Sequence, residues 1–185
     1  PKWSYITYEY PALGDRGPVT MYWYDGGKLP NEELMKGCPR EGNGNLYSSG
    51  ALVVGDKGSL FSPGDYGGDA GNTGVVRDGQ FTPQSEIRNA DAKYTRSPGH
   101  FKEWAEAIKG NGTPVSNFQD YAGPLTETVL LGNLAVWVAA GEGPGNETVG
   151  PAVEWNAEKM EAKDATDDVK LIIKPEYRDG YTLDA

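Results

Sequence analysis

Three consecutive residues, Trp23, Tyr24 and Asp25, have side chains suited to holding a hydroxylated ligand. They end an aromatic segment and are followed by two glycines. Indole and phenol rings combine an apolar face with a polar edge, and a carboxylate accepts hydrogen bonds from hydroxyl groups. Sugars and polyols offer both an apolar surface for such rings and hydroxyl groups for the carboxylate. Aromatic side chains on a strand also commonly face a core or an interface, so the pattern leaves both interpretations open.

His100 is the only histidine, and histidine is the side chain that titrates near neutral pH. We expect it in the first turn of a helix, where the helix dipole favours the neutral ring. There it serves either as a hydrogen-bond donor to a ligand or as a capping and packing residue. We assign no catalytic residue, because the sequence lacks a G-x-S-x-G motif, an H-E-x-x-H motif and a phosphate-binding glycine loop.

No metal or cofactor is expected for this chain alone. Cys38 is the only cysteine, so it has neither a disulfide partner nor a second thiolate for zinc. Asp65, Asp69 and Asn72 lie in a glycine-rich segment, but their spacing does not match a calcium-binding loop. No strand is followed by G-x-G-x-x-G, the pattern typical of dinucleotide binding.

The composition limits the classes of protein that fit. The 185 residues include 26 glycines and 13 prolines, and 37% are hydrophobic, which predicts one loop-rich domain over residues 1–185. The formal net charge of −10 argues against nucleic-acid binding. The most apolar stretch, Val129 to Ala140, is too short to cross a membrane.

The elements that position these side chains begin with two predicted strands. Residues 3–10 and 19–24 are aromatic and β-branched, and we expect them to pair as an antiparallel hairpin. Alternation places Val19, Met21 and Trp23 on one face and Thr20, Tyr22 and Tyr24 on the other. A second hairpin is predicted from residues 51–54 and 59–62, and an irregular stretch from residue 63 to residue 98.

Two helices are predicted in the second half. Ser97, Pro98 and Gly110 mark the ends of the first, whose apolar stripe is formed by Phe101, Trp104, Ala105 and Ile108. The second runs from Pro124 to Gly141 and is apolar nearly all round, which predicts a buried helix against the sheet. A helical turn at residues 31–36 and a short strand at 152–155 complete the prediction. The fold class is α+β: an open, mostly antiparallel β-sheet with helices packed on one face.

Several segments, in order and at natural spacing, resemble one known domain. They are PKWSYITYEYPALGDRGPVTMYWYDGG, ALVVGDKGSLF, RSPGHFKEWAEAIKG, SNFQDYAGPLTETVLLGNLAV, VEWNAEKM and EYRDGY. Together they resemble the C-terminal domain of the Gfo/Idh/MocA family of oxidoreductases, and most closely a bacterial branch with many exported members. This branch favours a periplasmic over a cytoplasmic location.

The resemblance implies a parent protein with an N-terminal Rossmann domain that binds NAD(P). The family's catalytic motif, Glu-Lys-Pro, belongs to that domain, and its catalytic histidine lies just upstream of the position that matches Pro1. We therefore expect the catalytic residues to lie before Pro1, and we expect this chain alone to be inactive. Lys174-Pro175-Glu176 has a different residue order and is not that motif.

The resemblance also implies a role for the chain itself. The C-terminal domain helps to form a site for a sugar or polyol and builds homo-oligomers through its sheet face. On this interpretation Asp25 accepts hydrogen bonds from the substrate, His100 donates to it, and Trp23 or Tyr24 packs on the ring. Two alternatives remain open: a non-catalytic module that binds carbohydrate or protein, and a parent that uses NAD to hydrolyse glycosides.

Overall fold

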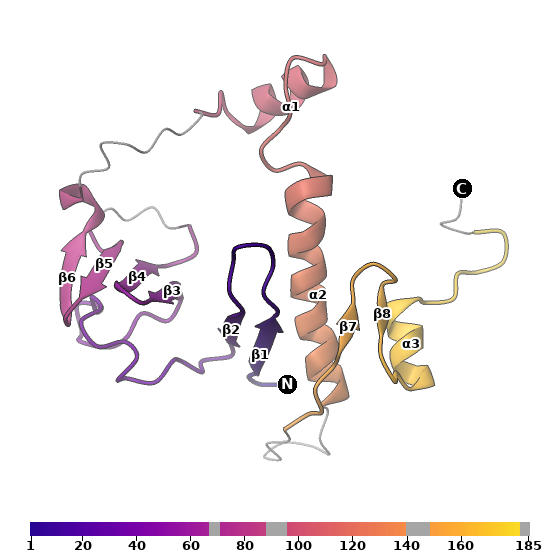
Figure 1. The fold of residues 1–185 in the computed structure, drawn as a ribbon, viewed down its shortest axis with the longest axis horizontal. Helices are drawn as coiled ribbons and strands as arrows, with labels where there is room; N and C mark the ends of the chain where they lie inside the picture. Colours follow the sequence, from indigo (N-terminus) through magenta and orange to yellow (C-terminus); the bar gives the residue numbers. More distant parts are fainter. Residues whose placement is uncertain (67–70, 88–95, 140–148, 182–185) are drawn as a thin grey trace. The chain divides into compact units, whose positions relative to one another are not determined.

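The computed structural model describes residues 1–66, 71–87, 96–139 and 149–181 (Figure 1). The chain divides into two compact units, residues 1–96 and residues 97–185. Strands dominate the first unit and helices the second, and every sheet is open and antiparallel. The predicted α+β class is confirmed. The assignment of residues 1–185 to a single domain stays a prediction.

The first hairpin forms as predicted. Strands β1 (Tyr5–Tyr10) and β2 (Val19–Tyr24) pair antiparallel, with Tyr5 opposite Tyr24. Because cross-strand partners share a face, the hairpin has two chemically different sides. The tyrosine face carries Tyr5, Thr7, Glu9, Thr20, Tyr22 and Tyr24, and the tryptophan face carries Ile6, Tyr8, Tyr10, Val19, Met21 and Trp23.

A separate four-stranded sheet follows. Its order is β3 (Gly50–Gly55), β4 (Gly58–Pro63), β5 (Gly74–Arg77) and β6 (Gln80–Pro83). The β3–β4 hairpin confirms the second predicted hairpin. A short 3₁₀ turn, η1 (Gln84–Glu86), follows β6.

The prediction of an irregular stretch from residue 63 to residue 98 was wrong where β5 and β6 form. The two strands are joined at Asp78 and Gly79, whose φ angles of 51° and 72° are both left-handed. An Asp-Gly pair with this geometry is a favoured two-residue hairpin turn. The dipeptide was therefore a sequence signal for the hairpin.

The core of the first unit draws on loop residues as well as on the sheet. Met35, Cys38 and Leu46 pack with Phe61 of β4 and Val76 of β5. Met35 is placed by the predicted helical turn, in which the Asn31 side chain accepts a hydrogen bond from the Glu33 backbone N–H at 2.9 Å. Burial raises the pKa of the Cys38 thiol, so this cysteine behaves as a small core residue.

In the second unit, helix α1 (His100–Ile108) starts later than Ser97 and Pro98 indicated. Gly99 has a φ of 102°, which is outside the helical region, and the Ser97 hydroxyl accepts a hydrogen bond from the Gly99 N–H at 3.1 Å. Gly110 ends the segment with a φ of 79°, as predicted.

The apolar stripe of α1 is exposed rather than buried. Phe101 is 90% exposed, and Trp104 and Ile108 are also largely exposed. No residue of α1 is buried. The spacing of these residues therefore predicted the helix correctly but not a burial of its stripe.

Helix α2 (Gly123–Val138) follows a short π-helical turn, η2 (Phe118–Ala122). It confirms the predicted second helix, although Gly141 lies outside the described residues. Only Gly132 and Leu134 of α2 are buried. The predicted packing of this helix against the sheet would join the two units and stays a prediction.

The remaining elements are short. Strand β7 (Trp155–Asn156) pairs with β8 (Glu161–Ala162), so the predicted strand at 152–155 begins three residues later. The Trp155 indole N–H donates to the Glu127 carboxylate of α2 at 2.6 Å. Helix α3 (Asp167–Ile173) begins after Thr166, whose hydroxyl caps the helix. No helix in the described ranges has both the length and the apolar character needed to cross a bilayer.

Candidate functional site

Asp25 closes the open end of the β1–β2 hairpin. The Ser4 backbone N–H donates to Asp25 Oδ1 at 2.8 Å, and the Asp25 N–H donates to the Ser4 carbonyl at 3.1 Å. The hydrogen bond from Ser4 holds the pKa of the Asp25 carboxyl below its usual range, and the Trp23 indole adds to this effect. The carboxylate therefore has a structural partner, and its role as a ligand acceptor stays a prediction.

A tight turn carries the chain away from Asp25. Gly26 and Gly27 have φ angles of 62° and 89°, and the Lys28 N–H donates to the Asp25 carbonyl at 3.1 Å. A Cβ atom on Gly26 would lie 2.2 Å from the Lys2 carbonyl oxygen, so only glycine fits there. The Lys28 ammonium lies 3.9 Å from the centre of the Trp3 ring, a cation–π contact that fixes the start of the chain on the turn.

The structure separates two of the predicted aromatic contacts. Trp23 lies on the tryptophan face, where it is half-exposed and interacts with Asp25. Tyr24 lies on the tyrosine face, with its ring centre 4.9 Å from that of Tyr5. Burial first, and Tyr5 second, raise the pKa of Tyr24. One sugar ring cannot stack on both Trp23 and Tyr24, because they point to opposite sides of the strand.

His100 lies in the second unit, whereas the other three predicted residues lie in the first. It is the first residue of α1 and is exposed. Nearby, the Glu103 carboxylate accepts from the Ser97 hydroxyl and, at 2.6 Å, from the Val115 N–H. These bonds, with a smaller contribution from His100, lower the pKa of Glu103. The role of His100 as a ligand donor stays a prediction.

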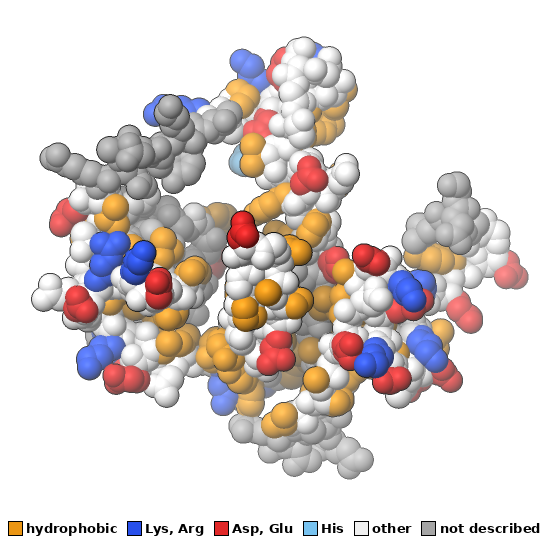
Figure 2. Space-filling view, in the orientation of Figure 1, with side chains coloured by type: hydrophobic (Ala, Val, Ile, Leu, Met, Phe, Trp, Pro, Cys, Tyr) orange, Lys and Arg blue, Asp and Glu red, His pale blue; other side chains and the backbone are white. Residues whose placement is uncertain are grey.

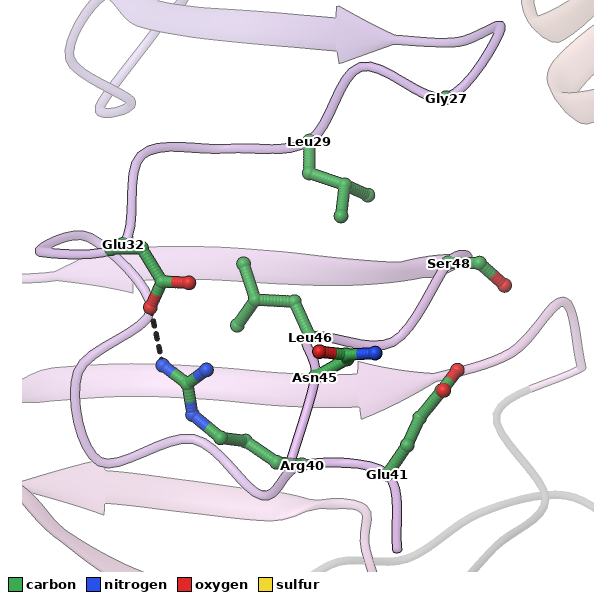
Figure 3. Close-up of a pocket in the computed structure, with 8 residues that line it drawn as sticks. All are labelled: Gly27, Leu29, Glu32, Arg40, Glu41, Asn45, Leu46 and Ser48. Carbon is green, nitrogen blue, oxygen red and sulfur yellow. Dashed lines mark hydrogen bonds and ion pairs between the residues drawn. The ribbon is translucent and has the colours of Figure 1, made fainter. Parts of the chain in front are cut away.

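A shallow hollow of about 400 Å³ lies in the first unit, beginning two residues after Asp25 (Figure 3). Leu29 and Leu46 point towards each other across its centre, and polar side chains surround them. Its lining residues are Gly27, Leu29, Glu32, Arg40, Glu41, Asn45, Leu46 and Ser48. Sequence reasoning missed this site, because its polar residues are scattered along a segment of turns and loops that has no helix or strand.

One ion pair sets the charge of the hollow. The Arg40 guanidinium bonds to the Glu32 carboxylate and also donates to the Gly44 carbonyl at 3.2 Å. The pair lowers the pKa of Glu32 and raises that of Arg40. Both groups are therefore charged at neutral pH and mutually neutralised.

A compact turn that directly follows Arg40 forms another part of the lining. The Glu41 N–H donates to the Asn45 carbonyl at 3.0 Å, and the Gly44 N–H donates to the Glu41 carbonyl at 2.8 Å. The Asn45 N–H donates to the Asn43 side chain at 2.9 Å. These bonds hold the backbone that carries the Glu41 and Asn45 side chains.

Comparisons with protein-family models, with curated proteins and with solved structures gave no match. Within the described part of the chain, no group of three or more histidine, cysteine, aspartate or glutamate side chains is placed to hold a metal ion. Asp69, one of three residues considered for calcium, lies outside the described residues.

Proposed function

We propose that this chain is the substrate-side and subunit-interface domain of an NAD(P)-dependent oxidoreductase of the Gfo/Idh/MocA type that acts on a sugar or polyol. A Rossmann domain supplies the nicotinamide cofactor and the hydride chemistry. This chain supplies the surface that holds the substrate and the surface that joins subunits. The proposal starts from the sequence resemblance stated above and is supported by the two sides of the β1–β2 hairpin.

The observation that supports it best is the chemical difference between those sides. The tryptophan face ends at Trp23 and Asp25, next in sequence to the hollow, and offers an indole and a carboxylate. The tyrosine face carries the exposed rings of Tyr5 and Tyr22, stacked with their centres 6.0 Å apart. Rigid aromatic side chains of this kind are enriched in protein interfaces. One hairpin thus serves substrate on one side and a partner subunit on the other.

A second candidate is a carbohydrate-binding module without catalysis. It is favoured by the location of Trp23, Asp25 and the hollow, which all lie within residues 1–96. A ligand held there needs no contribution from a cofactor domain. The two candidates differ in whether the ligand is converted once the chain acts together with a nucleotide-binding domain.

Isothermal titration calorimetry of the 185-residue chain tests the proposal. We expect millimolar binding of one or more neutral monosaccharides or polyols, which corresponds to about −4 kcal/mol, and no binding of NAD⁺ or NADH. If the ligand stacks on the tryptophan face, Trp23→Ala should weaken sugar binding about tenfold, because a stacking surface is lost. Trp137→Ala, which removes an exposed indole from α2, is the matched control. Micromolar binding of NAD⁺ by this chain would contradict the assignment.

A further inference from the structure

We infer that the hollow binds a neutral polyhydroxy compound and that the Glu32–Arg40 ion pair makes it reject sugar acids and sugar phosphates. This inference rests on the proposed function, because it names the substrate class and the place where the first unit holds it. An arginine at a sugar site normally suggests an anionic ligand. The hydrogen bonds of Arg40 lead to the opposite conclusion.

The shape and the apolar centre of the hollow suit a ring or chain of CH–OH groups. A volume of about 400 Å³ is within the range of small-molecule sites and exceeds what one monosaccharide needs. Leu46 is almost fully buried at its base, whereas Leu29 is 40% exposed. Leu29 therefore offers most of the apolar surface to the C–H groups of the ligand, and the polar groups around it are left for its hydroxyls.

Three other polar side chains of the lining have unused hydrogen-bonding capacity. Within the described residues, neither the Asn45 side-chain amide nor the Ser48 hydroxyl forms a hydrogen bond. The Glu41 carboxylate accepts only a long bond, 3.3 Å, from the Asn43 side chain. Between them these groups both donate and accept, which is what hydroxyl groups require.

The charge of the hollow disfavours anions. Arg40 is neutralised by Glu32 and holds the Gly44 carbonyl as well. The charge that remains uncompensated is that of Glu41, so the lining carries a formal charge of −1. A carboxylate or phosphate entering the hollow would have to displace Glu32 from Arg40 and approach Glu41. Neutral ligands meet neither cost.

The test uses ¹⁵N-resolved NMR titration of the 185-residue chain with myo-inositol and glucose as neutral probes, and with gluconate and glucose 6-phosphate as anionic ones. We expect a neutral probe to shift the backbone amides of Asn45 and Ser48 and to bind at least tenfold more tightly than either anion. Asn45→Ala should weaken that binding at least fivefold, because the side-chain amide offered to the hydroxyls is lost. The backbone bonds of residue 45 that hold the turn are retained.

The decisive variant is Glu32→Gln, which removes the negative charge that neutralises Arg40. It should increase affinity for gluconate at least tenfold. Glu33→Gln is its matched control, because Glu33 is the next residue, pairs with Lys36 at 3.6 Å and does not line the hollow. Glu33→Gln should leave the preference for neutral probes unchanged.

The outcomes separate this inference from the proposed function. Neutral probes that shift only the amides around Trp23 would overturn the hollow as the site and leave the proposed function intact. Tighter binding of gluconate than of glucose to the wild-type chain would overturn the charge argument alone. If Glu32→Gln does not raise the affinity for gluconate, the charge argument alone is likewise overturned. If no probe at 50 mM shifts any amide, both this inference and the proposed function fail.

Discussion

Asp25 has a structural role at the open end of the hairpin and a proposed role in ligand binding. Its carboxylate accepts from the Ser4 N–H at 2.8 Å, and this bond lowers its pKa. A carboxyl with a lowered folded-state pKa stabilises the fold above its unfolded pKa of about 3.9, and that stability is lost as the pH falls through the folded pKa. The contribution of the Asp25 charge to stability is therefore complete at neutral pH and disappears in acid.

We predict that Asp25→Ala lowers the free energy of unfolding by about 0.5–1 kcal/mol at pH 7, the value of one exposed hydrogen bond. The difference from wild type should shrink as the pH falls from 5 to 2, because protonation removes the same interaction from the wild-type chain. Thermal unfolding followed by circular dichroism measures this difference. Asp15→Ala, at the exposed tip of the same hairpin, is the control. A difference that grows in acid would contradict the assignment.

Local sequence patterns pointed to some candidate residues and not to others. Trp23, Tyr24 and Asp25 were proposed because they are adjacent to each other and to two glycines, and their role in binding stays a prediction. Alternation along a strand also predicted that Trp23 and Tyr24 face opposite ways, as the register confirms. The pairing of Glu32 with Arg40 was not predictable, because it depends on how an irregular loop folds back on itself. Such contacts depend on tertiary structure and have no periodic signal.

At the scale of elements, turns were predictable where glycine geometry is strict. Gly110 ended α1 as expected, and the turn between β3 and β4 formed as expected. The predicted start of α1 was wrong because Gly99 has a positive φ and lies outside the helix. The Ser97 hydroxyl accepts from the Gly99 N–H, before the helix begins. The β5–β6 hairpin was missed because few apolar residues flank its Asp-Gly turn. These errors concern where an element begins or whether a short one forms, and the long elements were found.

The turn after β2 provides an element-scale prediction with an internal control. Gly26 and Gly27 are both left-handed, but a Cβ on Gly26 would meet the Lys2 carbonyl oxygen at 2.2 Å, whereas one on Gly27 meets nothing within 4 Å. Gly27→Ala should therefore cost about 1 kcal/mol, the penalty for a left-handed residue with a side chain. Gly26→Ala should cost about 1–3 kcal/mol more, because backbone atoms must move.

Chemical denaturation of the two alanine variants and the wild type, with equal m-values, measures these costs. Gly26→Ala should also reduce the cation–π contact between Lys28 and Trp3 and so change tryptophan fluorescence in the folded state. Equal stability of the two variants would show that the approach of the chain start to this turn is looser than the structure indicates.

At the scale of the whole molecule, much apolar side-chain surface is exposed. Buried hydrophobic residues in the described ranges are Met35, Cys38, Leu46, Phe61, Val76, Leu134 and Val169. Many large ones remain at the surface, and Figure 2 shows hydrophobic side chains exposed among polar ones. Contiguous exposed apolar surface is typical of protein interaction sites. The composition predicted enough apolar residues for a core, but it carries no information on which of them a partner covers.

The tyrosine face is the part of this surface that we propose for subunit contacts. Tyr5 and Tyr22 are each about half exposed and stack on one another, and Thr7, Glu9 and Thr20 extend the same face. A standard interface buries about 800 Å² per partner, more than two tyrosines supply, so the threonines and the neighbouring residues must take part. Stacked rings at the centre of such a patch typically contribute most of the binding energy.

We therefore predict that the 185-residue chain self-associates, and that Tyr22→Lys weakens its dimerisation at least tenfold. The substitution places a strongly hydrated charge at the centre of the patch, where aromatic residues are favoured and lysine is depleted. Sedimentation velocity from 1 to 100 μM measures the effect as a loss of the concentration-dependent increase in sedimentation coefficient. Tyr66→Lys is the matched control, because Tyr66 is 98% exposed and lies in a loop outside the hairpin. A monomeric wild-type chain at 100 μM, or equal effects of the two substitutions, would remove the tyrosine face as the interface.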